Sequence, residues 1–460
     1  MSLPRYPEYK DSGVEWLRNT PSHWNVMRLM WAASCNDDTL PEETQADFVM
    51  EYVDIGSVSL DYGIERTEAI PFQDAPSRAR RLVRDGDVLI STVRTYLKAI
   101  APVLKPPENM VVSTGFAVVR PNEQLRSRFA KFVLQAEGFV NGVISHSTGV
   151  SYPAINASDL VRLPIPVPPP NEQAAIAVFL DRETGKIDAL IAKQGKLIAL
   201  LGEKRRATIS HAVTRGLNPD VPMKDSGVVW LGEVPSHWQL KRLKHIKAKV
   251  PNAFVDGPFG SNLKSEHFVD GGDVYVVESN FATQNKIDER ELKTISQRHF
   301  ETIARSEVVS GDIVIAKIGA QFGKASILPQ LSKQSVVSGN SLKLTVNPVT
   351  CTAEWVHLQL VNLKGVGEID LLANGSAQPA LSLGGMNTLP VVLPPLAEQV
   401  EVLRFLADET GKLDKLQAGA ERTIALLKER RSALISAAVT GQIDVRGAVP
   451  HPAVQEELVP

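Results

Sequence analysis

The sequence KDSGVEWLRNTPSHWNVMRL at residues 10–29 returns as KDSGVVWLGEVPSHWQLKRL at residues 224–243, with 13 of 20 positions identical. A second pair of segments, residues 163–218 and 389–444, agrees at 27 of 56 positions without a gap. Two matching segments in the same order indicate an internal duplication, which outranks any local pattern in deciding the fold. The chain is therefore predicted to be a tandem repeat.

The segments between the repeated pieces, residues 30–162 and 244–388, are unlike each other apart from short echoes such as DGDVLISTVR and SGDIVIAKIG. Both alternate short β-branched runs with Gly, Pro, Asn and Asp clusters, as strands and turns require. Each insert is predicted to be one α/β (α+β) domain. Strands are expected at residues 88–93, 111–119, 274–277, 313–318 and 342–346, and helices near residues 126–137 and 353–363.

After the prolines at residues 168–170, apolar residues recur at alternating spacings of three and four, the period of an amphipathic helix. Glu172 and Glu398 fall in the first turn of the two copies, where a helix dipole favours negative charge. The segment from Glu172 to Thr214 predicts a helix of about 65 Å, and Gly185 and Gly411 are candidate kinks. An apolar stripe of this length needs a partner, so we expect the two helices to pair as an intramolecular coiled coil. The alternative is that each helix packs on its own neighbouring domain.

Composition narrows the class of protein. The chain has 460 residues, 43% hydrophobic and 22% charged, which is typical of a globular protein of several domains. Its net charge of -2 excludes a uniformly basic surface but allows local basic faces. Two cysteines and nine histidines show no metal-ligand spacing. The sequence also lacks a membrane-length apolar run and a signal-like N-terminus, so we expect a cytoplasmic location.

Catalytic motifs are not found in the sequence. GAQFGKA at residues 319–325 is one residue too short for a phosphate-binding loop and lacks its Ser or Thr, so a turn is the better interpretation. The repeated Ser-His-Trp at residues 22–24 and 236–238 suggests a nucleophile. However, adjacent residues on an extended segment face opposite ways, and no third partner recurs beside them. We interpret Trp24 and Trp238 as buried anchors and expect a non-catalytic chain.

The repeated motifs resemble the DNA-specificity (S) subunits of type I restriction-modification systems. The resemblance rests on the opening Gly-Val-x-Trp-Leu followed by Pro-Ser-His-Trp, on Pro-Pro-x-x-Glu-Gln at residues 169–173 and 395–399, and on the Glu-Thr-Gly-Lys and Ala-Val-Thr helix segments. Each occurs twice, in family order, across residues 10–444.

The resemblance implies two target recognition domains joined by two long antiparallel helices in a pseudo-two-fold arrangement. The implied organisation is an N-terminal conserved segment (1–29), recognition domain 1 (30–162), a central conserved helical region (163–218), a linker with the repeated segment (219–243), recognition domain 2 (244–388), a C-terminal conserved helical region (389–444) and a flexible tail (445–460).

The resemblance also implies the partners: double-stranded DNA, two methyltransferase (M) subunits and two restriction/translocase (R) subunits. The chain would read a bipartite, asymmetric DNA target and direct adenine methylation and restriction. S-adenosylmethionine, ATP and Mg would bind the partner subunits, with no cofactor or metal on this chain. The competing hypotheses are a stand-alone sequence-specific DNA-binding protein of another defence assembly, a self-sufficient restriction enzyme, and a coiled-coil scaffold.

Candidate DNA contacts are drawn from basic and polar residues near turns. The cluster Arg78, Arg80, Arg81 and Arg84 suits phosphate contact, and Arg94 suits a bidentate contact with guanine. A solvated charged face is the alternative for the cluster, and loop capping is the alternative for the polar loop residues. The remaining candidates are Tyr96, Lys98, Ser147, Thr148 and Tyr152 in the first domain, with Gly149 beside them, and Asn262, Lys264, Lys317, Gln321, Lys324, Asn374, Ser376 and Gln378 in the second.

Overall fold

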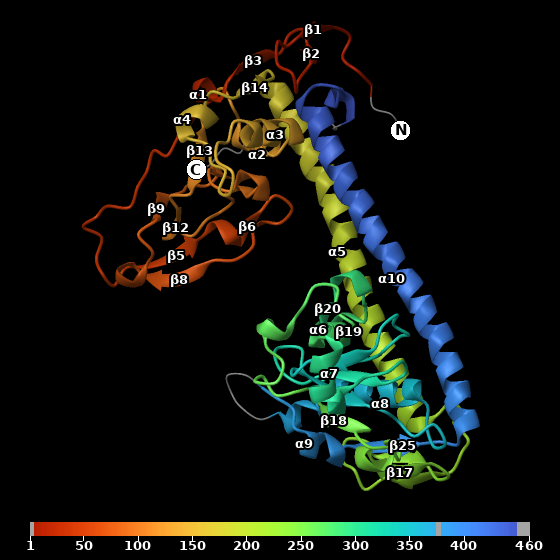
Figure 1. The fold of residues 1–460 in the computed structure, drawn as a ribbon. Helices are drawn as coiled ribbons and strands as arrows, with labels where there is room; N and C mark the ends of the chain where they lie inside the picture. The colour runs from red at the N-terminus through yellow and green to blue at the C-terminus, as the bar shows by residue number, and fades with distance from the viewer. Residues whose placement is uncertain (1–3, 374–378, 449–460) are drawn as a thin grey trace. The chain divides into compact units, whose positions relative to one another are not determined.

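The computed structural model describes residues 4–373 and 379–448. Contacts divide the chain into two compact units, residues 1–195 with 421–460 and residues 196–420. Each unit contains one of the two inserts together with part of both long helices (Figure 1). The tandem repeat thus produces two units built from the same kinds of element.

The two long helices are α5 (Pro170–Arg215) and α10 (Leu396–Val439). They occupy the segments that the apolar spacing predicted. Both run without interruption through the candidate kinks, so neither Gly185 nor Gly411 ends its helix.

Ion pairs show how the two helices run past each other. In the first unit, Arg431 Nε near the end of α10 lies 2.9 Å from Asp188 Oδ1 in the first half of α5. In the second unit, Arg205 near the end of α5 contacts Asp414 in the first half of α10. The start of each helix therefore lies beside the end of the other, which confirms the predicted antiparallel intramolecular pair.

The repeated segment folds in the same way in both units. A hairpin precedes a strand that pairs antiparallel with the strand just before the long helix. Trp24 and Trp238, both 0% exposed, fill the space beneath, which confirms their prediction as anchors. These strands are β1 (Tyr9–Asp11), β2 (Asn19–Pro21), β3 (Asn25–Arg28) and β14 (Pro164–Val167) in the first unit, and β15 (Met223–Asp225), β16 (Glu233–Pro235), β17 (Gln239–Arg242) and β25 (Pro390–Leu393) in the second.

The first insert contains a sheet of order β11-β10-β13-β4 and another of order β8-β5-β12-β9. Apart from the short helix α1 (Leu29–Ala32), its α-helices lie after the last strand of the insert. The bounds are β4 (Ala33–Cys35), β5 (Val49–Val53), β8 (Glu68–Pro71), β9 (Ala79–Leu82), β10 (Val88–Ser91), β11 (Ile100–Pro102), β12 (Met110–Ser113), β13 (Phe116–Pro121), α2 (Ser127–Val133), α3 (Glu137–Ser145) and α4 (Ala157–Leu160).

The second insert contains sheets of order β18-β24-β21-β22 and β20-β19-β23. Its longest helix, α8, follows the last strand, as α2 does in the first insert. The bounds are β18 (Phe254–Asp256), β19 (Val274–Val277), α6 (Ser279–Gln284), β20 (Lys293–Ile295), α7 (Gln297–Ile303), β21 (Ile313–Ala316), β22 (Ala325–Ile327), β23 (Ser335–Val337), β24 (Ser341–Leu344), α8 (Ala353–Gly365) and α9 (Leu383–Thr388).

The two inserts share one arrangement of strands although their sequences differ. In the first sheet of each, the central pair is antiparallel with matching register, β10 to β13 in one and β21 to β24 in the other. The other sheet of each contains one parallel pair, β12 with β5 and β23 with β19. The α/β class predicted for both inserts is confirmed.

One predicted strand is wrong in its extent. Residues 111–119 form two strands, β12 and β13, which belong to different sheets. The chain turns between them at Gly115, where a Cβ atom would lie only 2.5 Å from Ile55 Cδ1. A continuous apolar run hides this turn because strands buried on both faces show no alternation.

The two ends of the described chain meet in the first unit. The backbone N–H of Asp444 donates to the carbonyl oxygen of Pro4 at 2.8 Å. The Tyr9 hydroxyl donates to the carbonyl oxygen of Gly441 at 2.9 Å, and the Arg446 guanidinium lies 4.8 Å from the centre of the Tyr6 ring. The segment after α10 is thereby fastened to the segment before β1.

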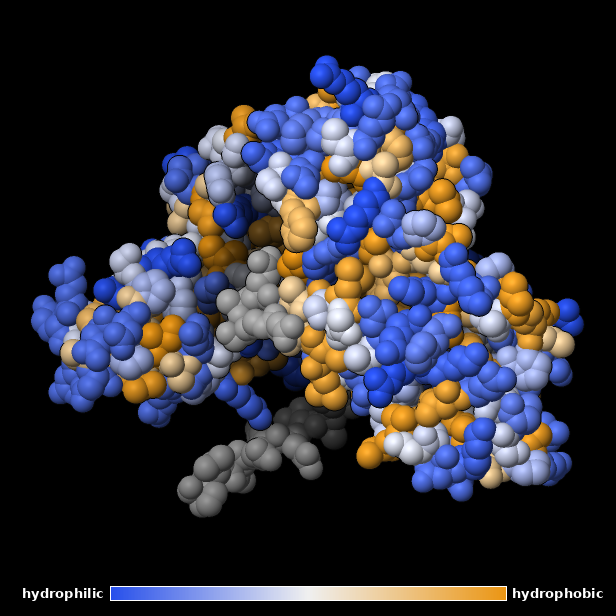
Figure 2. Space-filling view, turned by 60° about the horizontal axis from the view of Figure 1, so that its bottom comes forward, coloured by the Kyte–Doolittle hydropathy of each residue, from blue (hydrophilic) through white to orange (hydrophobic). Residues whose placement is uncertain are grey.

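Hydrophilic residues are interspersed with small apolar groups over the face seen in Figure 2. Among the described residues, no helix is both long enough and apolar enough to cross a membrane.

Candidate nucleic-acid interface

In the first unit, two loops far apart in sequence form one surface. The loop after β10 meets the loop after α3 through a bridge between Val93 and Ala154 and a 2.7 Å hydrogen bond between the hydroxyls of Thr95 and Ser147. The Arg94 guanidinium lies 4.7 Å from the centre of the Tyr152 ring. Six predicted contact residues are therefore brought together: Arg94, Tyr96, Lys98, Ser147, Thr148 and Tyr152.

The backbone holds this surface in an uncommon conformation. Arg94 and Lys98 adopt the left-handed region, with φ of 49° and 53°. Buried Thr95 fixes the short turn between them. Side chains other than glycine visit this region rarely, and such residues are concentrated at functional sites.

The side chains on this surface suit a polyanion with aromatic bases. Tyr96 is 52% exposed and Tyr152 is 66% exposed, although large aromatic rings are usually buried. The Arg94 guanidinium beside them is also exposed. Cationic and aromatic side chains together bind phosphates and stack on bases, the two contacts that nucleic-acid readers combine. We call these two loops, residues 92–98 and 147–152, the first loop surface.

The predicted arginine cluster is spread along β9 instead of forming one face. Arg78 Nε lies 3.4 Å from the Tyr52 hydroxyl, and the Arg80 guanidinium covers the Phe72 ring at 4.8 Å. Arg81 Nε is buried and has no hydrogen-bond partner among the described residues. Arg84 NH2 pairs with Asp38 Oδ2 at 2.9 Å. Arg78 and Arg84 are the exposed members, so a phosphate role for the cluster falls mainly on them.

An ion-pair network that the sequence did not reveal lies next to Arg84. Arg120 donates from Nε and NH2 to both carboxylate oxygens of Asp87, at 2.9 and 2.8 Å, and from NH1 to Asp38 at 2.6 Å. The hydrogen bonds with Asp87 raise the pKa of Arg120, and those from Arg120 lower the pKa of Asp38. The network secures the base of β10, from which the first loop surface extends.

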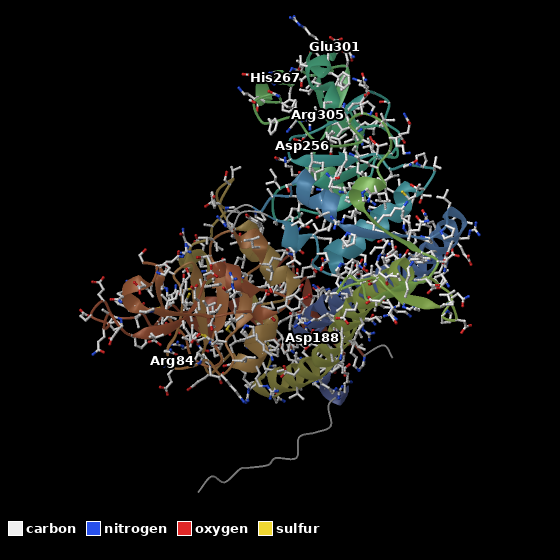
Figure 3. All side chains as sticks on the ribbon, turned by 90° about the horizontal axis from the view of Figure 1, so that it is seen from below. Arg84, Asp188, Asp256, His267, Glu301 and Arg305 are labelled. Carbon is white, nitrogen blue, oxygen red and sulfur yellow. The ribbon has the colours of Figure 1, made fainter. Side chains whose placement is uncertain are left out.

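The second unit has a comparable loop after β21. Its Lys317 Nζ lies 3.4 Å from Asp256 Oδ2, and Arg305 binds the other oxygen of the same carboxylate at 3.1 Å (Figure 3). Gln321 and Lys324 are exposed on this loop. A bridge between residues 318 and 380 repeats the one between residues 93 and 154 in the first unit. The loops after β10 and after β21 thus occupy equivalent positions in the corresponding sheets of the two units.

Two other predicted contacts of the second unit, Asn262 and Lys264, lie on the segment after β18. Lys264 Nζ lies 3.8 Å from Glu266 Oε1, and the carbonyl oxygen of Asn262 bonds His299 Nε2 at 2.9 Å. The His267 and His299 rings stack beside them, 4.0 Å between centres. Asn374, Ser376 and Gln378 lie outside the described residues.

The Ser-His-Trp motif has a recurring partner, contrary to the sequence-based expectation. Glu172 accepts hydrogen bonds from Trp24 Nε1 at 3.0 Å and the Tyr6 hydroxyl at 3.1 Å, and its other oxygen lies 2.7 Å from His23 Nε2. Burial and the Glu172 charge raise the pKa of Tyr6. Ser22 bonds Glu8 instead of the histidine, so the motif is no nucleophile relay.

The same contacts recur in the second unit, where Glu398 lies 2.8 Å from His237 Nε2 and accepts from Trp238 Nε1 at 3.0 Å. Glutamate at the start of each long helix therefore does more than complement the helix dipole. It clamps the repeated N-terminal motif to the helix. We call these contacts the Glu-His-Trp clamps.

Among the described residues, no group of three or more His, Cys, Asp and Glu side chains is arranged to hold a metal ion. Cys35 and Cys351 are free thiols. Burial raises the pKa of Cys35 to about 11, and burial also raises the pKa of Cys351.

Comparisons with known proteins agree with this architecture. Residues 80–198 match the family model of the type I restriction modification DNA specificity domain. The chain is 22% identical over 306 residues to the type I restriction enzyme MjaVIII specificity subunit of Methanocaldococcus jannaschii, covering 66% of this chain and 67% of that protein. It is 20% identical over 423 residues to the EcoBI specificity subunit of Escherichia coli, covering 86% and 87% of the two chains.

A chain from a solved structure concerned with complex assembly and conformational transition of the type I R-M system shares the fold. The TM-score is 0.64 at 22% identity, and the match covers 91% of this chain and 98% of that chain. In sequence, the chain is similar to type I restriction enzyme specificity subunits over as much as 86% of its length, and the resemblance seen in its repeated motifs is confirmed.

Proposed function

We propose that this chain is the DNA-recognition subunit of a type I restriction-modification system. The observation that carries the proposal is that two units with the same strand arrangement present different side chains from the same loop position. Exposed Arg94, Tyr96 and Tyr152 lie on the first loop surface, whereas exposed Gln321 and Lys324 lie on the loop after β21. Two unlike readers in one frame fit a DNA target made of two different halves.

The division of labour in this proposal leaves catalysis to partners. The chain would be non-catalytic and cytoplasmic, would bind double-stranded DNA, and would assemble with two methyltransferase and two restriction subunits. S-adenosylmethionine, ATP and Mg would bind those partners. Apolar side chains exposed along the long helices support a docking role, namely Val178, Leu190 and Leu426 in the first unit and Leu197, Leu200, Val400, Phe405 and Leu416 in the second.

The first loop surface would contact one half of the DNA target. Phosphate contacts would come from Lys98, and base contacts from Arg94, whose guanidinium is oriented by Tyr152. The antiparallel helix segments within each unit would fix the position of the DNA-contacting loop of that unit. We propose the loop after β21, with Gln321 and Lys324, as the reader of the other half.

Methylome sequencing of a methylation-free host tests the proposal. The host expresses this chain with its neighbouring methyltransferase subunit, and the control expresses the methyltransferase alone. A split motif methylated only when this chain is present supports the proposal and gives both half-sites. No new methylation from a soluble, co-purifying pair overturns it and favours a DNA-binding protein of another assembly.

A further inference from the structure

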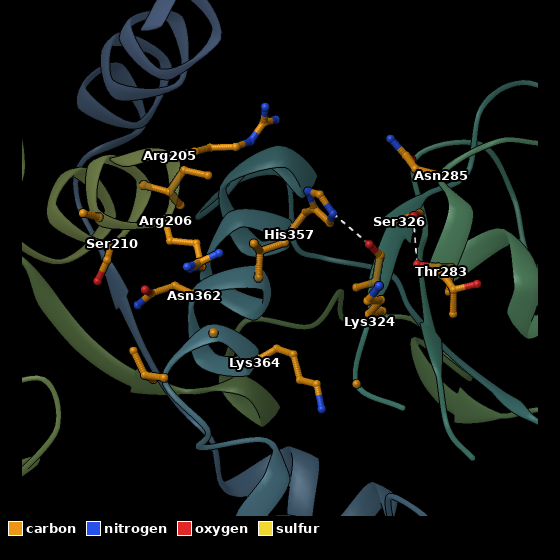
Figure 4. A pocket seen from close by; sticks show the side chains of 18 residues that line it. Arg205, Arg206, Ser210, Thr283, Asn285, Lys324, Ser326, His357, Asn362 and Lys364 are labelled. Atoms are coloured by element: carbon orange, nitrogen blue, oxygen red, sulfur yellow. Dashed lines mark hydrogen bonds between the residues drawn. The ribbon is translucent and has the colours of Figure 1, made fainter. Parts of the chain in front are cut away.

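A pocket of about 540 Å³ lies in the second unit, and the end of the loop after β21, with Gly323 and Lys324, forms part of its lining (Figure 4). It is enclosed by the last turns of α5, one face of α8, the end of α6 and the start of β22. The apolar part of the lining comes from Ile209, Ala282, Ala325, Val361 and Val366. A volume of this size is in the range of small-molecule sites.

One polar group in the pocket has its hydrogen-bonding capacity unused. Asn362 is only 5% exposed, and its Nδ2 has no hydrogen-bond partner among the described residues. Buried amide groups are nearly always paired, because an unpaired buried donor costs free energy. The neighbouring His357 does not serve it, since His357 Nε2 bonds the carbonyl oxygen of Ala325 at 2.9 Å. Asn362 Nδ2 is therefore a free donor within an apolar lining.

The charges of the lining are all positive. Four cations line the pocket, Arg205, Arg206, Lys324 and Lys364, and its 18 lining residues include no Asp or Glu. Arg205 contacts Asp414, and Lys364 contacts Asp370, so these two are neutralised. Arg206 and Lys324 have no ion pair within the part of the chain that the structure describes. An acidic group on a ligand would complement these two cations.

Arg206 and Asn362 have no polar equivalent with the same function in the first unit. In the aligned copy, Arg206 corresponds to Ser432. The residues before α8 and before α2 donate their backbone N–H to the glutamine near the start of the corresponding long helix, which aligns the two segments. Counted from that hydrogen bond, Asn362 corresponds to Ala136, which is buried and has no side-chain donor. The donor and the free arginine therefore belong to the second unit alone.

We propose that this pocket binds a small organic anion with a flat or elongated apolar body, its acidic group held by Arg206 and Lys324 and a second acceptor held by Asn362 Nδ2. Nucleotides and aromatic or fatty acids share this chemistry. Because Lys324 lies on the loop after β21, an occupied pocket adjoins a predicted DNA reader. The inference concerns a ligand site and stands independently of the proposed restriction role.

Fluorescence titration of the full chain with anilinonaphthalene sulfonate, an aromatic anion, tests the proposal. We expect saturable binding of one probe per chain. Arg206→Gln and Asn362→Leu should each weaken probe binding by about tenfold, because the first removes an exposed cation that would meet the acidic group and the second removes a buried donor. Arg298→Gln, which changes an exposed arginine of α7 in the same unit, is the matched control and should bind as the parent chain does.

Val361→Trp provides an independent test because a larger side chain would fill the pocket. We expect it to abolish probe binding while the thermal midpoint of the chain is retained. Displacement of the probe by adenosine monophosphate identifies the nucleotide source, and displacement by dodecanoate identifies the fatty-acid source. Binding to many sites, or equal affinity in Arg206→Gln, Val361→Trp and the parent chain, overturns the proposal.

Discussion

Replacing Glu172 by glutamine tests the Glu-His-Trp clamp of the first unit. The side chain of Glu172 is 5% exposed and its carboxylate faces three hydrogen-bonding groups, on Tyr6, Trp24 and His23, with Arg446 NH1 3.7 Å from Oε1. In its better orientation, the glutamine oxygen keeps the Trp24 and Tyr6 donors and the amide N–H₂ faces His23. One hydrogen bond to a charge is then lost, and two others become bonds to a neutral oxygen. Bonds to a charged group contribute about 1.5 to 3 kcal/mol and neutral ones about 0.5 to 1.5 kcal/mol, so we expect the first unit to lose about 3 to 5 kcal/mol of stability.

Glu398→Gln is the matched control in the second unit. Its side chain is 27% exposed, and it has two donors instead of three. Water replaces part of what is lost, so the expected cost is about 1 to 2 kcal/mol. Both changes remove a similar helix-dipole contribution of about 0.3 to 1 kcal/mol, which cancels in the comparison. The first change should therefore exceed the second by about 2 kcal/mol, or roughly 30-fold in an opening equilibrium.

Hydrogen-exchange mass spectrometry measures the two units separately, which a single unfolding curve does not do for a chain of two units. The informative peptides cover α2 and α3 in the first unit and α8 in the second. We expect Glu172→Gln to raise exchange in α2 and α3, with little change in α8. Equal loss of protection from the two variants in their own units would refute the reasoning, as would unchanged protection in Glu172→Gln.

Four further outcomes follow from described contacts. Arg120→Met should destabilise the first unit by about 3 kcal/mol, measured as faster hydrogen exchange in β10 and β13, because it leaves the buried carboxylate of Asp87 without its ion-pair partner. Burial lowers the pKa of His357 from its ordinary value of 6.5, so protonation favours unfolding and the second unit should lose stability as pH falls below about 6.5. His357→Gln should flatten that pH dependence, measured from the free energy of opening of α8 in hydrogen exchange. With a pKa of about 11, Cys35 should carry roughly one thiolate in a thousand at pH 8, so iodoacetamide should label it only after denaturation. In DNA-binding assays, Arg94→Ala should change base preference at one position of the target, whereas loss of a phosphate contact would weaken all sequences alike.

Much of the fold could be predicted from the sequence because its signals are local or repeated. The helices α5 and α10 followed from an apolar spacing of three and four that persists from Ile176 to Leu201 and from Val402 to Leu434. The common topology of the inserts could not be predicted. A buried strand such as β10 or β21 needs only apolar side chains of suitable volume. Dissimilar sequences can therefore form sheets with the same strand order, and comparing the two insert sequences does not reveal it.

The candidate site was predicted in part. The residues of the first loop surface could be predicted from their side-chain types. That its two loops lie side by side could not, because this depends on the bridge between Val93 and Ala154, which is a long-range contact. The Glu-His-Trp clamps were missed because Glu172 and His23 lie 149 residues apart. A signal was nevertheless present, since the same glutamate, histidine and tryptophan recur at aligned positions in both copies.

The contacts between the chain's two ends have a consequence for biosynthesis. The second unit uses residues 196–420, so all of it has been synthesised before the segment after α10 is made. The first unit needs Asp444 to meet Pro4, and Gly441 to meet Tyr9. Its N-terminal strands are therefore synthesised early but gain their contacts with residues 441–444 only at the end of translation. More than four hundred residues are translated in between. At about 5 to 20 residues per second this delay is roughly 20 to 90 seconds, during which the apolar side of the first motif is open to chaperones.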